Sequence, residues 1–483
     1  MLKLNQPKKQ EKRYLMNNIL QQFNEDVTNL VDIYLKKLLF TDGIAEFTND
    51  LEGKFAEFGS KVTQYLVDMV EKIIFETKER KKQFESLERD DRTVISIFGE
   101  INFKRRYYNE KDVDDKVYLL DQTLEIEPNK RLLSNVLERL IDRAIDTSYE
   151  DAGSNVAYGV KISKQEVKNE IEKLDLNKDF YPEVKEKKKV KNIYVLADED
   201  HVHLQEGGIE EPRIIVVYDG IKKNGKRVEL ENKRHFGGIY TNKIDDLWEE
   251  VADYIEKAYD TDYLENVYIL GDGATWIKTG LGWLIKSKFV LDEYHLKKAV
   301  NGIAGIEIKA KNEEIIENKK KLRNALRNLD FDSFIEKSKE IIKNETEPSK
   351  KKRKTQLMKY ILNNIEGIRN LYSKENELHG CSTEGHVSHV LSARMSTRPM
   401  GWSKTNVNNM SKLRLLKADN ISIKKILEEQ KKVVDIKEYK EIKEQVKQKM
   451  KNINFAPVTL PVMEFGKGYQ QKFFKNLLNK IVI

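Results

Sequence analysis

Two short apolar runs that each lead into an aspartate constrain this sequence most. Residues 193–196 (IYVL) precede Asp198, and residues 267–270 (VYIL) precede Gly271 and Asp272. Runs of this length, rich in β-branched and aromatic residues and closed by Gly or Asp, are typical of buried strands. A carboxylate at the end of a buried strand is costly unless it is paired or binds a cation. The pattern favours a shared site for Mg²⁺ or Mn²⁺ at one sheet edge, with ordinary strand-end turns as the alternative.

The composition limits the classes of protein to which the chain can belong. With 483 residues, roughly two to four domains are expected. No run of about 18 apolar residues occurs, so we expect no membrane span. The first residues also lack the apolar stretch of a signal peptide. The single cysteine, Cys381, excludes an internal disulfide and a multi-cysteine zinc site, which favours the cytoplasm. A net charge of +7 on 87 basic residues permits nucleic acid as a partner.

Changes in periodicity and charge divide the chain into successive segments. Apolar residues recur at three- and four-residue steps near the N-terminus, and the stretch 307–375 is helical in pattern and strongly basic. The predicted segments are a helical N-terminal region (1–90), a β-ribbon (91–123), a helix-turn-helix domain (124–180), the first part of a ribonuclease-H-like core (187–305), a helical basic insertion (306–378), the final catalytic helix of the core (379–415) and a helical C-terminal region (416–483).

Residues 92–108 (RTVISIFGEINFKRRYY) predict a hairpin around Gly99 and Glu100. The second strand carries Lys104, Arg105 and Arg106 next to aromatic residues. Basic residues interleaved with aromatics can follow a phosphate backbone. An edge strand protected by its charge explains the same pattern, and the sequence leaves both interpretations open.

Residues 131–174 have the pattern of a helix-turn-helix. A helical stripe is followed by a capped short helix, a tight turn at Tyr158-Gly159-Val160, and a capping box that opens at Ser163. The helix after this box would point four polar residues outward, as a recognition helix requires. These candidate DNA-binding residues are Lys164, Gln165, Lys168 and Asn169. A plain helical hairpin is the alternative.

The order of elements after residue 192 indicates an α/β fold with a mixed sheet. Three antiparallel strands are followed by helix, strand, helix and strand, which is the order of a ribonuclease-H-like domain. In that fold the acids of the first and fourth strands lie side by side. The predicted elements are strands at 192–205 and 213–218, an antiparallel hairpin whose turn at Asn224-Gly225 leads into 227–236, a helix at 245–259, the strand before Asp272, a helix through Trp276 and Trp283, and a strand at 288–291.

Two further stretches contain groups that can bind ions or phosphate. Asp292 and His295 are three residues apart at the start of a helix, which suits either a ligand pair or a hydrogen-bonded structural pair. Residues 379–403 predict a second helix that begins near Glu384 and also contains His386, His389 and Arg394. Glu384 suits the helix dipole, and it also suits a third carboxylate delivered to the paired acids.

With these residues on the page, the chain resembles bacterial insertion-sequence transposases of the Lre group. That group is also catalogued as an uncharacterised protein family and is related to Mutator-like DDE transposases. The resemblance spans most of the chain. Its motifs are GEINFKRRYY, the SYEDA–ISKQEV region, ADEDHVHLQ, LGDGATWIK, LDEYH and STEGHVSHVLSARMSTRPMGWS.

The resemblance implies a catalytic core with two aspartates and one glutamate. Asp198 matches the first acid, with Asp200 as its close rival, and Asp272 matches the second. Glu384 matches the third acid, after an insertion. Residues 292–295 (DEYH) resemble the Asp/Cys-x-x-His motif of Mutator-like relatives, which makes His295 a possible supporting residue.

The same resemblance implies a DDE-type transposase of an insertion sequence. It would bind double-stranded DNA at terminal inverted repeats and at the target, and catalyse cleavage and strand transfer with two Mg²⁺ (or Mn²⁺) ions held by the three acids. His386, His389 or Arg394 would position the scissile phosphate. A homodimer or larger synaptic complex is expected, in the cytoplasm and associated with the nucleoid. A metal-dependent nuclease on the same fold and a non-catalytic, transposase-derived DNA-binding protein are the alternatives.

Overall fold

The described part of the chain folds into two compact units. Unit 1 takes its residues from the ranges 1–144, 148–167 and 431–483, and unit 2 takes them from 145–147 and 168–430. Chains longer than roughly 250–300 residues divide in this way because single cores stop growing. The computed structural model describes residues 7–37, 43–111, 116–225, 227–241, 243–305, 313–378, 385, 388–397, 401–430 and 440–451.

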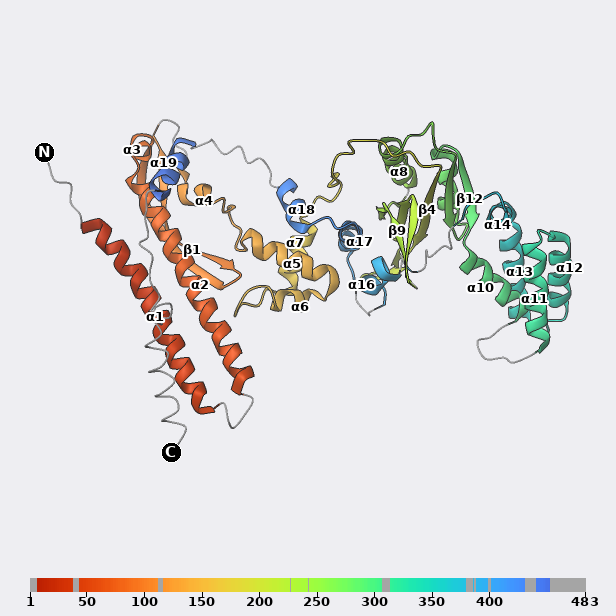
Figure 1. Ribbon diagram of the computed structural model, residues 1–483, viewed down its shortest axis with the longest axis horizontal. Helices are drawn as coiled ribbons and strands as arrows, with labels where there is room; N and C mark the ends of the chain where they lie inside the picture. Colours follow the sequence, from red (N-terminus) through yellow and green to blue (C-terminus); the bar gives the residue numbers. More distant parts are fainter. Residues whose placement is uncertain are drawn as a thin grey trace. The chain divides into compact units, whose positions relative to one another are not determined.

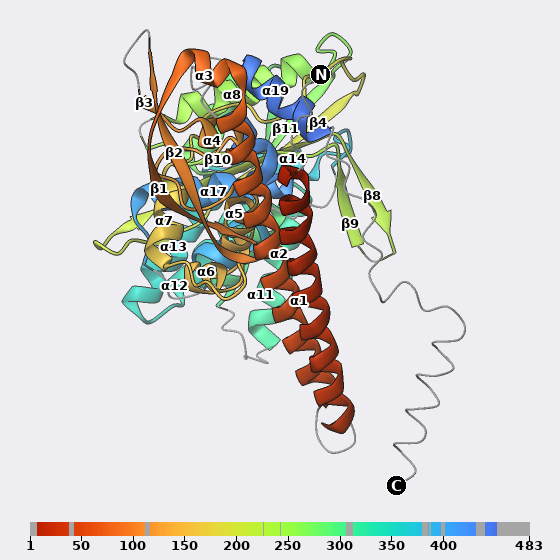
Figure 2. The ribbon, with the colours of Figure 1, turned by 90° about the vertical axis from the view of Figure 1, so that its left-hand side faces the viewer.

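Unit 1 begins with two long helices, α1 (Pro7–Lys37) and α2 (Gly43–Glu76). They lie side by side, as both ribbon views show (Figures 1 and 2). Apolar and aromatic residues at helical spacing hold them together, with the Phe23 and Phe58 ring centroids 4.4 Å apart. The hydroxyl of Tyr34 donates a hydrogen bond of 2.7 Å to Asp50, so the pair is also joined by a polar contact. A short helix, α3 (Lys78–Gln83), follows.

The predicted hairpin is present and longer than expected. β1 (Phe84–Ser96) pairs antiparallel with β2 (Gly99–Glu110), and β3 (Lys116–Val117) pairs with the other side of β2. β1 starts at Phe84, earlier than the expected Arg92. β3 pairs with Tyr108 and Asn109 of β2, after the basic residues 104–106. The interpretation of these basic residues as a protected edge strand therefore stays a prediction.

The core of unit 1 is formed by α2, the ribbon and α19 (Lys440–Lys451). Alternate residues of β2, such as Ile101 and Phe103, point to one face and pack with Ile73 of α2. Ile442 and Val446 of α19 and the short α4 (Leu119–Thr123) complete this core. Within the predicted helical C-terminal region (416–483), α18 (Ile423–Gln430) belongs to unit 2 and α19 belongs to unit 1.

Three helices follow the ribbon: α5 (Ser134–Asp146), α6 (Tyr149–Ser154) and α7 (Lys164–Glu172). The hydroxyl of Ser148 accepts a hydrogen bond from the Asp151 amide, and that of Ser163 accepts one from the Glu166 amide, both at 3.1 Å. These contacts are the helix caps that the sequence predicts. Gly159, with φ of +65°, makes the turn between α6 and α7 in a backbone conformation that suits glycine.

Unit 2 is built on a mixed five-stranded sheet in the order β10-β7-β4-β11-β12 (Figure 1). β7 is antiparallel to both β4 and β10, whereas β4, β11 and β12 run parallel. The strands are β4 (Asn192–Glu199), β7 (Arg213–Tyr218), β10 (Arg234–Gly238), β11 (Asn266–Gly271) and β12 (Ser287–Leu291). Parallel strands are buried on both faces, which explains their nearly continuous apolar sequences.

The two faces of the sheet have different partners. One face carries Val195 and Ile269 and packs against α8 (Ile244–Ala258) and α9 (Thr275–Trp283). The opposite face carries Tyr194, whose ring stacks between the rings of Tyr218 and Tyr268 at centroid distances of 5.1 Å and 5.6 Å. Asp198 follows Tyr194 by four residues, so the period of a strand places it on this second face.

The hairpin expected at Asn224-Gly225 is present, but residues 227–236 do not form one continuous strand of the core. Residues 227–236 form two elements, because β9 (Arg227–Glu231) pairs with β8 (Gly220–Asn224) in a separate hairpin and only β10 joins the sheet. Asn232 breaks the run with φ of +50°, and its side-chain amide donates a hydrogen bond of 2.8 Å to Asp219. A second small sheet, β5 (Val202–His203) with β6 (Ile209–Glu210), follows the end of β4.

The helical insertion is attached to the sheet through its first and last helices. After β12, α10 (Glu293–Ala304) packs on α11 and α13, and α14 packs on β12 (Figure 1). The remaining helices of this bundle are α11 (Glu313–Arg327), α12 (Phe331–Lys343), α13 (Pro348–Leu362) and α14 (Ile365–Tyr372).

The chain then returns to the sheet. A π-helical turn, η1 (Ser388–Ser392), and the short α16 (Ala393–Met395) precede α17 (Lys404–Ala418), which packs against β10. Among the helices described in either unit, none is both long and apolar enough to cross a lipid bilayer.

The contact between β10 and β7 gives a test of the sheet. A Cβ on Gly237 would overlap the backbone carbonyl oxygen of Arg213, and the glycine has φ of +153°. We expect Gly237→Ala to lower the free energy of unfolding by about 1–3 kcal/mol, measured by urea denaturation. Gly282→Ala is the control, because a Cβ there meets no atom within 4 Å and alanine favours a helix. Equal effects of the two substitutions would contradict this account of the sheet.

Candidate functional site

Three aspartates lie at or just after the ends of three neighbouring parallel strands. The β4–β11 register pairs Leu196 with Leu270, and two more residues in that register place Asp272 beside Asp198. Asp292 follows β12, and its amide donates a hydrogen bond of 2.8 Å to the Gly271 carbonyl. Ligand sites of α/β proteins lie at this carboxyl edge of the sheet. The structure therefore brings together the two acids that the sequence singles out and adds a third beside them.

Asp198 has the most perturbed carboxyl group of this edge. The pKa of Asp198 is raised to about 7, mainly by burial, and the negative charges of Asp272 and Glu199 contribute to this rise. A backbone hydrogen bond of 2.9 Å from the Glu199 amide and the nearby His295 act in the opposite direction. A strongly shifted carboxyl group beside a second carboxylate is typical of functional sites.

Asp292 and His295 form a hydrogen-bonded pair next to these acids. Asp292 caps α10 by accepting a hydrogen bond of 3.1 Å from the Tyr294 amide, and its other oxygen lies 3.0 Å from His295 Nδ1. The side chains are 3% and 22% exposed. The hydrogen bond with Asp292 raises the pKa of His295, and the charges of Asp198 and Asp272 add to the effect. The pair thus stabilises the start of α10, and the charge of His295 is coupled to those of Asp198 and Asp272.

The insertion holds the strand end that carries Asp272. The side chain of Asp272 accepts a hydrogen bond of 2.8 Å from the Ala274 amide, while its backbone carbonyl accepts one of 2.6 Å from the Tyr360 hydroxyl of α13. Gly273, with φ of +89°, leaves room for Asn364, which a Cβ would overlap. Sequence reasoning missed Tyr360 and Asn364, because nothing in the sequence of a helix about 90 residues downstream indicates a contact with this turn.

Glu199 belongs to the opposite face of the sheet. Its carboxylate accepts a hydrogen bond from the Trp276 indole, and the Arg213 guanidinium lies 5.2 Å from the Trp276 ring centroid. Burial raises the pKa of Glu199. This acid is held by its own aromatic and basic neighbours.

The choice between Asp198 and Asp200 is clearer in the structure. Asp200 is buried, and one of its oxygens accepts hydrogen bonds from the His201 amide at 3.0 Å and from the Ser396 hydroxyl at 2.9 Å. Asp198, by contrast, shares its electrostatic environment with Asp272 and His295. The geometry therefore favours Asp198 as the site acid and Asp200 as an anchor for the segment that contains Ser396.

Of the four candidates between residues 384 and 394, Glu384 and His386 lie outside the described residues. His389 is exposed on η1. Arg394 is 2% exposed, and its guanidinium lies 4.8 Å from the Trp402 ring centroid. Because the Arg394 side chain is almost fully buried, it does not offer solvent the surface that the expected direct contact with a phosphate requires.

The described residues on either side of Glu384 contact both ends of β4. The carbonyl of Glu377 accepts a hydrogen bond of 2.6 Å from the Tyr194 hydroxyl, near the start of the strand. Ser396 bonds to Asp200, just after its end. The chain before and after Glu384 is thus fixed against the strand that leads to Asp198.

The donor set at the sheet edge fits a divalent cation only in part. Carboxylate oxygens are the ligands that Mg²⁺ prefers, and two neighbouring carboxylates repel each other until a cation or a proton separates them. Asp198 and Asp272 supply two such groups. Within the ranges that the structure describes, no cluster of three or more His, Cys, Asp or Glu side chains is arranged to hold a metal ion. A complete ligand set thus requires a further group such as Glu384.

The two arginines of the ribbon that the sequence offers as DNA contacts are paired with acidic side chains inside unit 1. Arg105 pairs with Asp121 and lies 3.5 Å from the Tyr118 ring centroid. Arg106 pairs with Glu71 at 3.1 Å. Each arginine side chain is 12% exposed, whereas that of Lys104 is 65% exposed. Aromatic residues beside arginine therefore indicate internal cation–π packing here, and Lys104 alone of the three faces solvent.

The expected recognition helix presents the predicted face. In α7, Val167 is buried, while Lys164, Gln165 and Asn169 are exposed. Lys168 is half-buried and forms an ion pair of 3.7 Å with Glu172. The exposed polar face matches that of a helix that enters a major groove.

These features define an α/β protein with paired carboxylates at the edge of a mixed sheet. The chain belongs to the family described as Uncharacterised protein family (UPF0236), which matches residues 40–433. UPF0236 protein TTE2489 of Caldanaerobacter subterraneus subsp. tengcongensis is 35% identical over 459 residues, which cover 94% of this chain and 96% of that protein. UPF0236 protein TTE0402 of the same bacterium is 35% identical over 465 residues, covering 94% and 91%.

This bacterium contains many paralogues of the family. Another of its UPF0236 proteins is 34% identical over 465 residues, covering 94% of this chain and 96% of the relative, and its name joins eleven designations. A further name joins four.

The raised pKa of Asp198 predicts a pH-dependent stability. Because the folded state holds this proton up to about pH 7, stability should fall as pH rises from about 4 to 7. Asp198→Asn removes the effect, so at pH 8 without divalent cations the variant should be more stable than the natural protein by roughly 1–3 kcal/mol. Below pH 4 the two should be equal, as measured by urea denaturation.

Asp253→Asn is the control, because that exposed carboxylate pairs only with Lys257 in its own helix. It should change the unfolding free energy by less than about 0.5 kcal/mol. A constant difference between Asp198→Asn and the natural protein at all pH values would contradict the assignment of the raised pKa.

Proposed function

We propose that this protein is a DNA transposase of an insertion sequence with a ribonuclease-H-like catalytic core. The observation that carries the proposal is the placement of Asp198 and Asp272 at the ends of adjacent parallel strands, β4 and β11. The sheet order, with three antiparallel neighbours followed by two parallel strands, is the arrangement expected of that fold. Our proposal places the chain in the Lre group, which is related to Mutator-like transposases.

The number of paralogues supports a mobile element. A protein whose name joins eleven designations in one bacterium is present in many copies there. Copying of its own gene is what a transposase achieves, whereas a housekeeping nuclease gains nothing from such multiplication. The family description names no activity, so this support comes from copy number alone.

The proposed chemistry uses the acids as ligands. Asp198, Asp272 and Glu384 would hold Mg²⁺ or Mn²⁺, which lowers the pKa of an attacking water or 3′-hydroxyl and stabilises the leaving oxygen of the phosphodiester. The chain's own groups prepare this site. Burial keeps Asp198 protonated until about pH 7, so deprotonation and cation binding are coupled.

Neighbouring residues fix the geometry of these acids. Asp292 orients the His295 imidazole beside them, where a positive ring would offset their charge. Tyr360 holds the backbone of Asp272 and thus the direction of its carboxylate. Pre-set geometry of this kind lowers the reorganisation that a reaction at phosphate requires.

The DNA would be recognised away from the acids. We propose that α7 reads the terminal inverted repeats through Lys164, Gln165 and Asn169, with Lys104 of the ribbon on the phosphate backbone. Because strand transfer joins two ends of one element, the active form would be a homodimer or a larger synaptic complex. Such a protein would act at the nucleoid.

The catalytic proposal is tested by Asp272→Asn. With a duplex that carries the element's own end and Mg²⁺ present, we expect cleavage and strand transfer to fall roughly thousandfold. DNA affinity should stay within about twofold, since the side chain binds no phosphate in the ground state. Asp262→Asn, in the exposed turn before β11, is the matched control and should retain full activity.

The products decide between the proposed function and its rivals. Joined product requires strand transfer, whereas cleavage without joining identifies a metal-dependent nuclease. DNA binding with no Mg²⁺-dependent product from the natural protein would leave only a DNA-binding role.

Recognition by α7 gives a separate prediction. Gln165→Ala and Asn169→Ala should reduce discrimination between the element's end and unrelated DNA by about 1–3 kcal/mol each. Lys164→Ala should weaken binding to both DNAs and reduce the slope of log affinity against log salt by about one. Lys161→Ala is the control, because that lysine pairs with Glu150 just before the helix. Unchanged discrimination in the Gln165 and Asn169 variants, measured by fluorescence anisotropy, would exclude α7 as the reading helix.

A further inference from the structure

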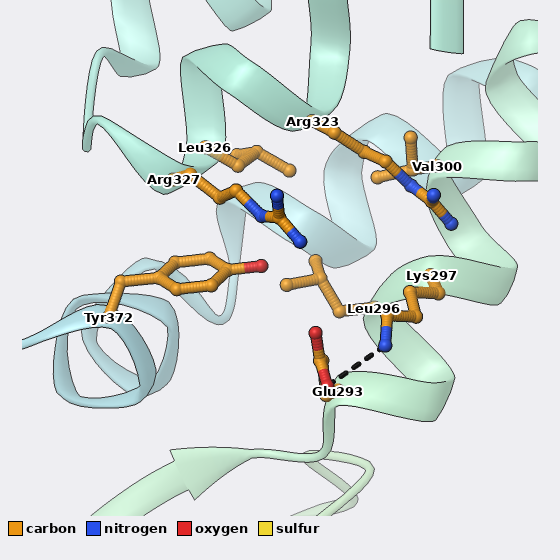
Figure 3. A pocket seen from close by; sticks show the side chains of 8 residues that line it. All are labelled: Glu293, Leu296, Lys297, Val300, Arg323, Leu326, Arg327 and Tyr372. Atoms are coloured by element: carbon orange, nitrogen blue, oxygen red, sulfur yellow. Dashed lines mark ion pairs between the residues drawn. The ribbon is translucent and has the colours of Figure 1, made fainter. Parts of the chain in front are cut away.

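A small basic pocket lies between α10, α11 and α14 of the insertion (Figure 3). Arg323 and Arg327 come from α11, Lys297 from α10 and Tyr372 from the end of α14. The apolar residues Leu296, Val300 and Leu326 complete its lining. Figure 3 shows the Arg327 guanidinium and the Tyr372 hydroxyl directed toward the same space.

The charges that line the pocket are unbalanced. Three basic side chains surround it, and the lining contains one carboxylate, Glu293. That carboxylate lies 2.9 Å from Lys297 Nζ, so it is matched by one cation and leaves two. Nε of Arg323 is buried and has no hydrogen-bond partner within the described ranges. One buried donor without a partner, together with excess positive charge in the same place, suits an anion.

The positions of the two arginines are also electrostatically unfavourable for α11. Arg323 and Arg327 are four residues apart, which puts both on one face of α11, and like charges at this spacing repel each other. Burial raises the pKa of Tyr372, and the side-chain hydrogen bond from Arg327 acts in the opposite direction. The hydroxyl accepts from Arg327 and can still donate its own proton to an anion. A bound anion would offset the repulsion and accept from these donors.

The pocket lies one helix away from the acids. Asp292 caps the start of α10, and His295 is two residues from Glu293, which puts them on nearly opposite sides of that helix. The acids and the pocket are thus separated by about the width of one helix, roughly 10 Å. A DNA strand advances about 3.4 Å per nucleotide, so the two positions are a few nucleotides apart along one strand.

We propose that the basic side chains lining this pocket bind, at its solvent-exposed surface, a backbone phosphate of the DNA strand on which the acids act, a few nucleotides from the scissile bond. The proposal rests on the proposed function and adds an anchor point to it. Arginine is suited to this task because its planar fork donates two hydrogen bonds to one phosphate, and the tyrosine hydroxyl can donate a third. Glu293 opposes an anion on one side, which directs the phosphate toward the arginines.

The test is the double variant Arg323→Gln, Arg327→Gln in the full-length protein. Binding to a duplex with the element's end is measured by anisotropy in EDTA over a series of salt concentrations. We expect roughly tenfold weaker binding and a decrease of about one in the slope of log affinity against log salt, as for one lost phosphate contact. An unchanged affinity and slope would overturn the proposal.

Lys320→Gln, Lys321→Gln is the matched control. Both lysines are exposed on α11, and Lys321 pairs with Glu317 in the same helix, so the control removes the same charge outside the pocket. It should bind within about twofold of the natural protein. An equal loss in this control would show general attraction to DNA and overturn the pocket.

A second double variant separates the charge of the two arginines from the forked geometry of their guanidinium groups. Arg323→Lys, Arg327→Lys keeps the charge and loses the fork, so the salt slope should stay while affinity falls by less than in the glutamine variant. A slope reduced as far as in the glutamine variant would count against the pocket. Because all arms are read in EDTA, they do not depend on cleavage. Absence of cleavage by the natural protein with Mg²⁺ would overturn the catalytic proposal and leave the pocket result standing.

Discussion

The parallel pairing of β4 with β11 is the constraint on which the rest of unit 2 depends. Its register sets Asp272 beside Asp198, and the apolar residues before each acid fix that register by filling the core on both faces. The sheet therefore holds two carboxylates together that would repel each other in isolation, and burial raises the pKa of Asp198 to about 7. The repulsion between these two carboxylates is compatible with a stable fold because the apolar core of the sheet is large.

The insertion interrupts the core in sequence and completes it in space. α14 covers β12, the Tyr360 hydroxyl holds the carbonyl of Asp272, and Asn364 fits against Gly273. A bundle that contacts the acids at one end and presents a basic pocket nearby can align a nucleic-acid strand with them. The same helices thus hold the edge of the sheet and carry the basic side chains that we propose as a DNA contact.

Several parts of the structure could be predicted because their causes are local. The caps at Ser148 and Ser163 depend on residues three positions away, and the strands before Asp198 and Asp272 depend on their own apolar runs. Features that depend on distant partners could not be predicted. The acidic partners of Arg105 and Arg106, which are Asp121 and Glu71, lie on other elements, and the run 227–236 breaks at Asn232, which bonds to Asp219.

The sequence by itself determined the order of elements, the two acids and the polar face of α7, because strand period, helix period and capping are properties of neighbouring residues. Only the tertiary structure distinguishes the environments of Asp198 and Asp200, since they differ in the contact of Asp200 with Ser396 and in the charges on other strands near Asp198. It also revealed the Tyr360 contact and the pocket of α10 and α11. Electrostatic coupling and pocket lining depend on distances between segments that are far apart in the chain, and no local pattern encodes them.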